Sequence, residues 1–178
     1  AGAMVTSSLT GCGLKDSATV ATVAGDEIPA GLANFYARMT QAQYESMYSS
    51  YLRDNMWTTE ASEGKTYEKL VKDEVLKDLE NMYLLEDHMD DYKISLSDDE
   101  KKAIKDAAKE FSKDNDKDDK EKVSGDTEYV ERYLTLATIK QKMTDAIEAE
   151  ADTNVTDDEA KQKSMQYVLF SINTTDAN

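Results

Sequence analysis

Cysteine, proline and glycine are scarce in this chain of 178 residues. Cys12 is the only cysteine, so no disulfide can form within one chain. One proline and seven glycines favour long, uninterrupted helices, because both residues are costly in helix interiors. No apolar stretch approaches the roughly 18 residues that span a bilayer as a helix. These absences exclude a disulfide scaffold, and they indicate that any attachment to a membrane needs a covalent anchor.

Basic residues are outnumbered, with 21 against 37 acidic residues and a formal net charge of -16. No run of lysine and arginine is free of acids, so the charge disfavours binding to nucleic acids, whose backbones are also anionic. An anionic membrane surface would repel the chain for the same reason. Two interpretations of the acidity stay open. It only keeps the protein soluble, or it also prevents irreversible adhesion to a bound polypeptide.

The N-terminal residues carry the most specific motif. Leu9-Thr10-Gly11-Cys12 resembles a bacterial lipobox, an aliphatic residue and two small residues before the cysteine. Small residues let the signal peptidase reach the bond, and the thiol accepts the diacylglyceryl group. We expect Ala1–Met4 to be the last part of the apolar region of a signal peptide, which is removed together with the rest of residues 1–11. Cys12 is then expected to carry more than one acyl chain. The alternative is an incidental free cysteine near a terminus.

The first half of the chain predicts a hairpin followed by two long helices. Small and β-branched residues alternate within Ala18–Ile28, around a turn at Ala24-Gly25. Apolar residues then recur at spacings of three and four, the period of one helical face, over Ala30–Trp57. Polar and small residues predict a loop over Thr58–Lys65. A second helix with a wide apolar surface is expected over Thr66–Tyr92.

The second half predicts two further helices. Ser97 and Glu100 have the spacing of a capping box, which opens a helix ending near Ser112. Its expected apolar stripe consists of Ile104, Ala107, Ala108 and Phe111. The mixed-charge run 113–122 is expected to be solvated, either without regular structure or as a fraying helix. Thr127 is a predicted cap for the next helix, whose apolar face consists of Tyr129, Tyr133, Leu136, Met143 and Ile147.

The C-terminal residues predict the beginning of another unit. Val155–Glu159 repeats the helix-start signal, and Met165–Phe170 has the composition of a strand without a following partner. We therefore divide the chain into a signal-peptide remnant, lipobox and tether (1–17), a helical domain (18–163) and the truncated start of a following domain (164–178).

Catalytic and metal-binding patterns are absent from the sequence. Three aspartates alternate as in the first half of an EF-hand loop: Asp114, Asp116 and Asp118. However, Asp119 stands where that loop needs glycine, and Gly125 stands where it needs glutamate. His88 is the only histidine, so neither a histidine metal cluster nor a Ser/His/Asp arrangement can form around it. We predict no catalytic residue, no metal site and no cofactor.

Methionine and tyrosine are the notable apolar residues, with 8 and 10 copies against one tryptophan and three phenylalanines. Flexible methionine and amphipathic tyrosine suit surfaces that accept many unrelated apolar segments. The alternative is that they only fill contacts between helices. Side chains between residues 39 and 57 spread over more than one helical face, so we predict client or domain contacts there: Met39, Tyr44, Met47, Tyr48, Tyr51, Met56 and Trp57.

The order of these parts resembles the N-terminal chaperone region of SurA/PrsA-type foldases. The likeness lies in the lipobox, the hairpin, the long helices, the starts at Ile94–Glu100 and Val155–Glu159, and the strand at Tyr167–Ser171. It implies a mainly α fold, a SurA-N-like bundle of long helices with a small N-terminal β-hairpin and a C-terminal strand. It also implies an extracytoplasmic lipoprotein, anchored at Cys12 to the outer face of the membrane, that binds unfolded or nascent secreted polypeptides.

In that family a parvulin domain isomerises X-Pro bonds with paired histidines. This chain has only His88, so any peptidyl-prolyl isomerase activity of the intact protein would lie beyond Asn178. The turn at Ala24-Gly25 also departs from the usual Asn-Gly, which affects local geometry more than function. Two alternatives stay open: a helical lipoprotein that pairs with one dedicated partner and has no foldase activity, and a homodimer.

Overall fold

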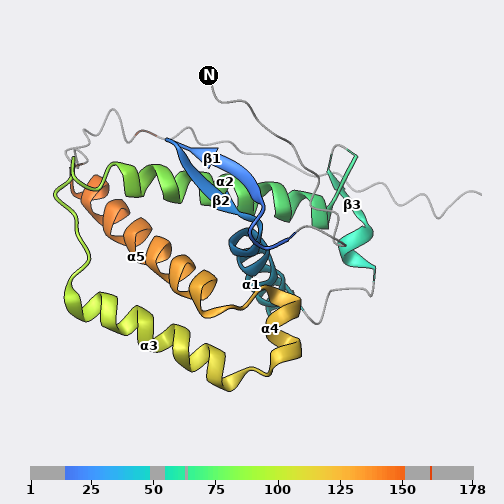
Figure 1. Cartoon of the computed structure of the whole chain (residues 1–178). Coiled ribbons are helices and arrows are strands. Elements are labelled where there is room, and N and C mark those ends of the chain that lie inside the picture. The colour runs from blue at the N-terminus through green and yellow to red at the C-terminus, as the bar shows by residue number, and fades with distance from the viewer. Residues whose placement is uncertain (1–14, 49–54, 63, 151–160, 162–178) are drawn as a thin grey trace, which may run out of the picture.

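The computed structural model describes residues 15–48, 55–62, 64–150 and 161. These residues form a mainly helical structure with a small antiparallel hairpin near the N-terminus (Figure 1). The elements are β1 (Thr19–Val23), β2 (Asp26–Pro29), α1 (Ala30–Tyr48), the 3-10 turn η1 (Met56–Thr58), β3 (Glu60–Ser62), β4 (Lys65–Thr66), α2 (Tyr67–Asp87), α3 (Asp98–Asp114), α4 (Lys117–Val123) and α5 (Thr127–Ala149).

The predicted N-terminal hairpin is confirmed. β1 and β2 pair antiparallel around Ala24 and Gly25, both of which have positive φ angles (52° and 101°). Positive φ at both central residues is typical of the tight turns that suit the twist of a hairpin. Val20 and Ile28 from the two strands are buried in the main core. The hairpin is therefore held by the helices against which it packs, since two strands alone are only marginally stable.

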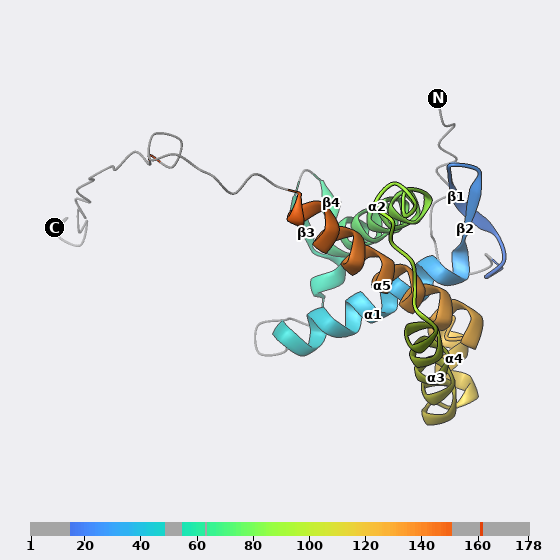
Figure 2. The ribbon, with the colours of Figure 1, turned by 90° about the vertical axis from the view of Figure 1, so that its left-hand side faces the viewer.

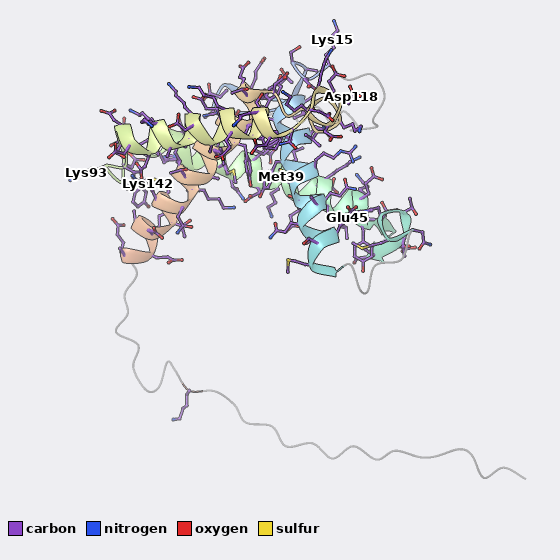
Figure 3. The ribbon with its side chains drawn as sticks, turned by 90° about the horizontal axis from the view of Figure 1, so that it is seen from below. Lys15, Met39, Glu45, Lys93, Asp118 and Lys142 are labelled. Atoms are coloured by element: carbon purple, nitrogen blue, oxygen red, sulfur yellow. The ribbon has the colours of Figure 1, made fainter. Side chains whose placement is uncertain are left out.

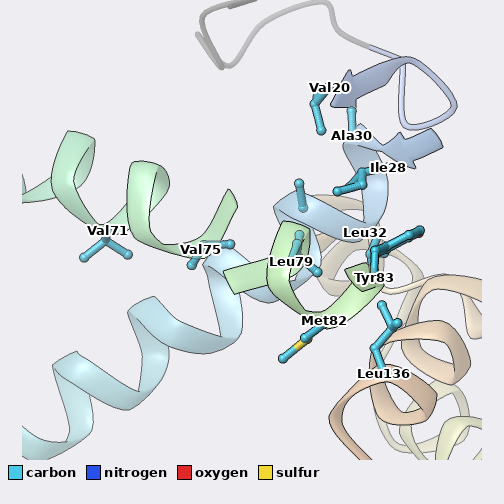
Figure 4. Close-up of a cluster of buried hydrophobic side chains, with 11 residues drawn as sticks. Val20, Ile28, Ala30, Leu32, Val71, Val75, Leu79, Met82, Tyr83 and Leu136 are labelled. Atoms are coloured by element: carbon cyan, nitrogen blue, oxygen red, sulfur yellow. The ribbon is translucent and has the colours of Figure 1, made fainter. Parts of the chain in front are cut away.

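α5 is the central helix, because it packs against α1, α2 and α3. In Figure 1 it runs diagonally between α2 and α3. The main core lies where the hairpin, α1, α2 and α5 meet, and Figure 4 shows this cluster. Each of these four elements contributes at least one of the largest fully buried side chains, which are Ile28, Leu32, Leu79, Leu136 and Met143. Burial of such side chains stabilises the fold by about 1.5 to 3 kcal/mol each.

A second cluster joins α1 to α3 and α5. Phe35, Ala108 and Val130 are buried together, with Phe111 packed against them. The Phe35 and Phe111 rings meet edge to face with centroids 5.5 Å apart, a favourable arrangement for aromatic pairs. Tyr133 contacts both clusters, so the two cores are continuous along α5.

The first helix is shorter than the sequence predicts. α1 ends at Tyr48, and Met56–Thr58 form a 3-10 turn instead of continuing it to Trp57. The hydroxyls of Thr58 and Thr59 donate to the Asn55 carbonyl, a local interaction that competes with helix formation. The predicted loop over 58–65 contains β3 and the first residue of β4, which pair as a second hairpin with Gly64 at φ 75°.

The other helix boundaries are close to the prediction. α2 ends at Asp87 instead of Tyr92, because an acidic segment is unfavourable at the negative end of a helix dipole. The capping box of Ser97 and Glu100 is confirmed, although α3 continues to Asp114. Part of the charged run forms the short helix α4, in keeping with the predicted alternative of a helical segment, and none of its residues is buried.

Three predictions about single residues were wrong. Ala107 is exposed, because the stripe of α3 is narrow and only the side bearing Ile104 and Ala108 meets α5. Asp126 occupies the cap position of α5, and Thr127 is its first helical residue. Ile147 is exposed in the last turn of α5. The predictions for Cys12, Tyr51, Val155–Glu159 and the strand at Met165–Phe170 concern residues outside those the structure describes.

Gly31 is required by close packing at the start of α1. A Cβ atom built there overlaps the ring of Tyr129 and lies 2.9 Å from Asp16 Cβ. We predict that Gly31→Ala lowers the free energy of unfolding by about 1 to 3 kcal/mol, as overpacking of a filled site does. Chemical denaturation measures this value, with the exposed change Ser46→Ala on the same helix as a control. A Gly31→Ala variant as stable as the wild type would contradict the packing described.

Glu100 makes the stability depend on pH. Its carboxylate accepts hydrogen bonds from Lys142 Nζ and from the Ser97 backbone and side chain, which together lower its pKa from 4.5 to about 2. Because the folded pKa lies below the unfolded one, the stabilisation is complete above pH 4.5 and is lost as the pH falls toward 2. We predict that Glu100→Gln unfolds at a lower temperature than the wild type near neutral pH.

This difference between Glu100→Gln and the wild type should narrow steadily below pH 4.5, where the wild-type carboxylate takes up its proton. Thermal unfolding followed by circular dichroism over a pH series measures it. A difference of constant size across the series would show that the charge of Glu100 contributes nothing.

Candidate functional site

Asp78 of α2 lies at the point where α1 and α5 cross. The Tyr36 hydroxyl of α1 donates to its Oδ2 at 2.6 Å, and Lys140 Nζ of α5 lies 2.6 and 2.8 Å from the two carboxylate oxygens. Burial and the hydrogen bond to Asp78 raise the pKa of Tyr36, so the phenol stays protonated and donates. The Tyr36 and Tyr133 rings lie 4.9 Å apart at the same crossing. One carboxylate thus joins three helices.

Beyond this crossing, α1 and α5 separate. Figures 2 and 3 both show their C-terminal halves pointing in different directions, with α2 behind them in Figure 3. The separation changes the exposure of side chains along one side of α1, where residues three or four positions apart lie above one another. Leu32 and Phe35 are 0% and 2% exposed on this side, whereas Met39 is 43% exposed and Met47 is 64% exposed. α5 covers the first half of the stripe and leaves the second half open.

One exposed side of the second half of α1 carries no charge. We call it the open stripe, and its residues, all exposed, are Met39, Ala42, Gln43, Ser46 and Met47. The two charged residues of α1, Arg38 and Glu45, lie on another side of the helix. There Arg38 Nη1 donates to Gln41 Oε1 at 2.8 Å, and Gln41 Nε2 donates to Glu45 Oε1 at 2.9 Å. Although 33% of the residues in the chain are charged, the open stripe has none. An apolar segment bound to the stripe would therefore not remove any of its side-chain charges from water.

The 3-10 turn brings Trp57 back against α1. Its indole N–H donates to Glu45 Oε1 at 2.8 Å, and its ring meets that of Tyr44 edge to face at 6.3 Å. Both rings are partly buried and pack against the main core. Tyr44 and Trp57 therefore support the C-terminal half of α1, beside the open stripe.

The predicted contact residues thus fall into two groups. Met39 and Met47 share the open stripe, whereas Tyr44, Trp57 and the partly buried Met56 lie at the junction with η1. Tyr48 is the last residue of α1, and Tyr51 is outside the described residues.

The small and neutral members of the stripe were not among the predicted contact residues. Ala42, Gln43 and Ser46 continue the side of α1 that begins with Leu32 and Phe35, and the helical period places them there. The predicted contacts are large apolar residues, so these three were not included. Their small or neutral side chains are what keep this face free of charge.

The other titratable groups in the described part of the chain form no metal site. His88 is exposed, with Nδ1 2.8 Å from Asp91 Oδ2, and this hydrogen bond raises its pKa. Within the described residues, no three histidine, cysteine or acidic side chains are grouped as metal ligands. No helix among those residues has the length and apolar character to cross a membrane.

Comparisons of the chain with family models, curated proteins and solved structures found no match. Function is therefore inferred from the residues and their geometry.

The hydroxyl of Tyr36 is expected to stabilise the helix crossing. Tyr36→Phe removes one hydrogen bond to a carboxylate while keeping the ring, so the free energy of unfolding should fall by about 1.5 to 3 kcal/mol. Denaturant titration measures the change, and Tyr67→Phe, at an exposed position on α2, is the control. Equal stability of the two variants would mean that the crossing does not depend on this bond.

Proposed function

We propose that this chain is the helical part of an extracytoplasmic chaperone of the SurA/PrsA type. It binds apolar segments of unfolded exported polypeptides along the open stripe of α1. The observation that carries the proposal is the stripe itself: two exposed methionines on a charge-free helix face in a chain of net charge -16. Methionine adapts its shape to many partners, as a surface for unrelated clients requires.

The size of the stripe supports transient binding. Full burial of one methionine contributes about 1.5 to 3 kcal/mol, so two partly exposed methionines contribute only a few kcal/mol. Binding energies of about 4 to 8 kcal/mol correspond to dissociation constants between about 1 mM and 1 μM. A client held this weakly is released quickly.

The same proposal includes the lipid anchor and the division of the chain. Cys12 would carry the acyl chains after removal of residues 1–11, and the helical domain would extend over 18–163. Residues 164–178 would begin a following, parvulin-like domain, which would supply any isomerase activity. The absence of a catalytic arrangement in the sequence, whose only histidine is His88, is consistent with a binding role for this part.

Charges placed on the open stripe should weaken client binding. We predict that Met39→Glu combined with Met47→Glu lowers the affinity for a permanently unfolded client about tenfold, since about 1.4 kcal/mol of lost contact is sufficient. Isothermal titration with a reduced, carboxymethylated client measures the affinity, and suppression of client aggregation measures activity.

Leu84→Glu is the matched control for this experiment. Leu84 is 44% exposed, almost the same as Met39, but it lies on α2 away from the stripe. The control variant should bind the client as the wild type does. The proposal fails if both variants bind normally, or if the wild type binds one folded protein in a fixed ratio and no unfolded client.

A further inference from the structure

The open stripe is symmetric about its central residue. Met39 stands four residues before Gln43 and Met47 stands four residues after it, so the three side chains lie on one side of α1. The methionines are 43% and 64% exposed, and Gln43 is exposed between them. The same order of side chains is therefore met from either end of the stripe. Such a surface can pair with an identical surface that runs in the opposite direction.

An antiparallel second copy of the chain matches the stripe residue by residue. When a two-fold axis passes between the two Gln43 side chains, Met39 of each copy is level with Met47 of the other. The Gln43 amide both donates and accepts hydrogen bonds, so two of these amides can bond to each other across the axis. The small side chains of Ala42 and Ser46 leave room for the methionines of the other copy. An interface of this kind is isologous, as in most homodimers.

The charges beside the stripe are also complementary to those of a second copy. Arg38 and Glu45 lie on the same flank of α1, where Gln41 bridges them. In the register centred on Gln43, Arg38 of one copy is only about 4.5 Å along the helix axis from Glu45 of the other. Both hydrogen bonds to Glu45, from Gln41 and Trp57, are accepted by Oε1, so Oε2 can accept from the arginine of the second copy. The two-fold axis makes two such charged pairs.

The net charge opposes most other contacts between copies. Each chain has a net charge of -16, so two copies repel each other wherever their acidic surfaces meet. The open stripe has no charge, and two stripes can meet without placing like charges face to face. Figure 2 shows the C-terminal half of α1 extending away from α3 and α4. This half of the helix is therefore presented to another molecule.

We propose that a second copy of this chain covers the open stripe when no client is bound, through an antiparallel contact between the two α1 helices centred on Gln43. The contact involves only half of one helix from each copy, much less than the interface of an obligate dimer, so the dimer is weak and reversible. Its existence does not depend on the proposed function. Its consequence does: clients and the second copy compete for Met39 and Met47, and self-association shields these side chains when clients are scarce.

Analytical ultracentrifugation over a concentration series that reaches the millimolar range measures the self-association. Gln43→Glu places two like charges opposite each other on the two-fold axis, so the dissociation constant of the dimer should rise about tenfold or more. Asn81→Glu adds the same charge at an exposed position of α2 and should dimerise as the wild type does. A wild type that stays monomeric at every concentration overturns the proposal, and so does equal dimerisation of the two variants.

Disulfide cross-linking tests the register of the two helices. In a Cys12→Ser background, Gln43→Cys places one cysteine of each copy at the two-fold axis, where the two can be oxidised to a disulfide. Ser46→Cys is the matched control, because its two cysteines lie about 9 Å apart along the helix axes, farther than the roughly 7 Å that a disulfide spans between Cα atoms. Mild oxidation should link the copies of Gln43→Cys and leave Ser46→Cys monomeric. Equal linkage of both variants overturns the antiparallel contact.

The dimer and the proposed function fail separately. Addition of a permanently unfolded client should convert the dimer into a complex of one chain with the client. A dimer that persists with client bound overturns the competition between them. A chain that binds the client but never dimerises overturns the second copy as the occupant of the stripe and leaves the proposed function standing. A chain that dimerises through Gln43 but binds no client overturns the proposed function and leaves the contact between copies standing.

Discussion

The crossing of α1 and α5 over Asp78 determines the rest of the structure. Tyr36 and Lys140 converge on this carboxylate from opposite helices, and a partly buried acid is stable only if such partners satisfy it. The crossing seals Leu32 and Phe35 against α5 and leaves Met39 and Met47 uncovered. The core and the open stripe are therefore two parts of one helix side, divided by one polar contact.

Other polar contacts hold the helices at the angles that this crossing requires. Arg132 forms two hydrogen bonds of 2.6 Å with Glu86 and lies over the Tyr83 ring, 4.6 Å from its centre. Lys142 holds Glu100 in the same way at the start of α3. Paired charges between helices suit a chain that is too polar for one thick core. The open stripe of α1 is free of charge, so an apolar partner would desolvate no charged group of the stripe.

Much of the fold could be predicted from the sequence, because many of its elements are specified by residues that are close together in the chain. The hairpin, the capping box at Ser97 and the periods of α1, α2, α3 and α5 depend on neighbouring residues. The end of α1 could not be predicted, since the return of Trp57 depends on its bond to Glu45. The open stripe was predicted only in part: Met39 and Met47 were identified by type, but their exposure depends on where α5 crosses, a long-range contact without a local signature.

The central claim is that clients bind the uncovered half of α1, and the methyl groups of its methionines report on this directly. Selectively labelled methionine methyl groups can be followed by NMR while an unfolded client is titrated into the protein. The account predicts that the signals of Met39 and Met47 shift or broaden, whereas those of the buried Met82 and Met143 do not. Perturbation of the buried methionines alone, or of none of the four, would contradict it.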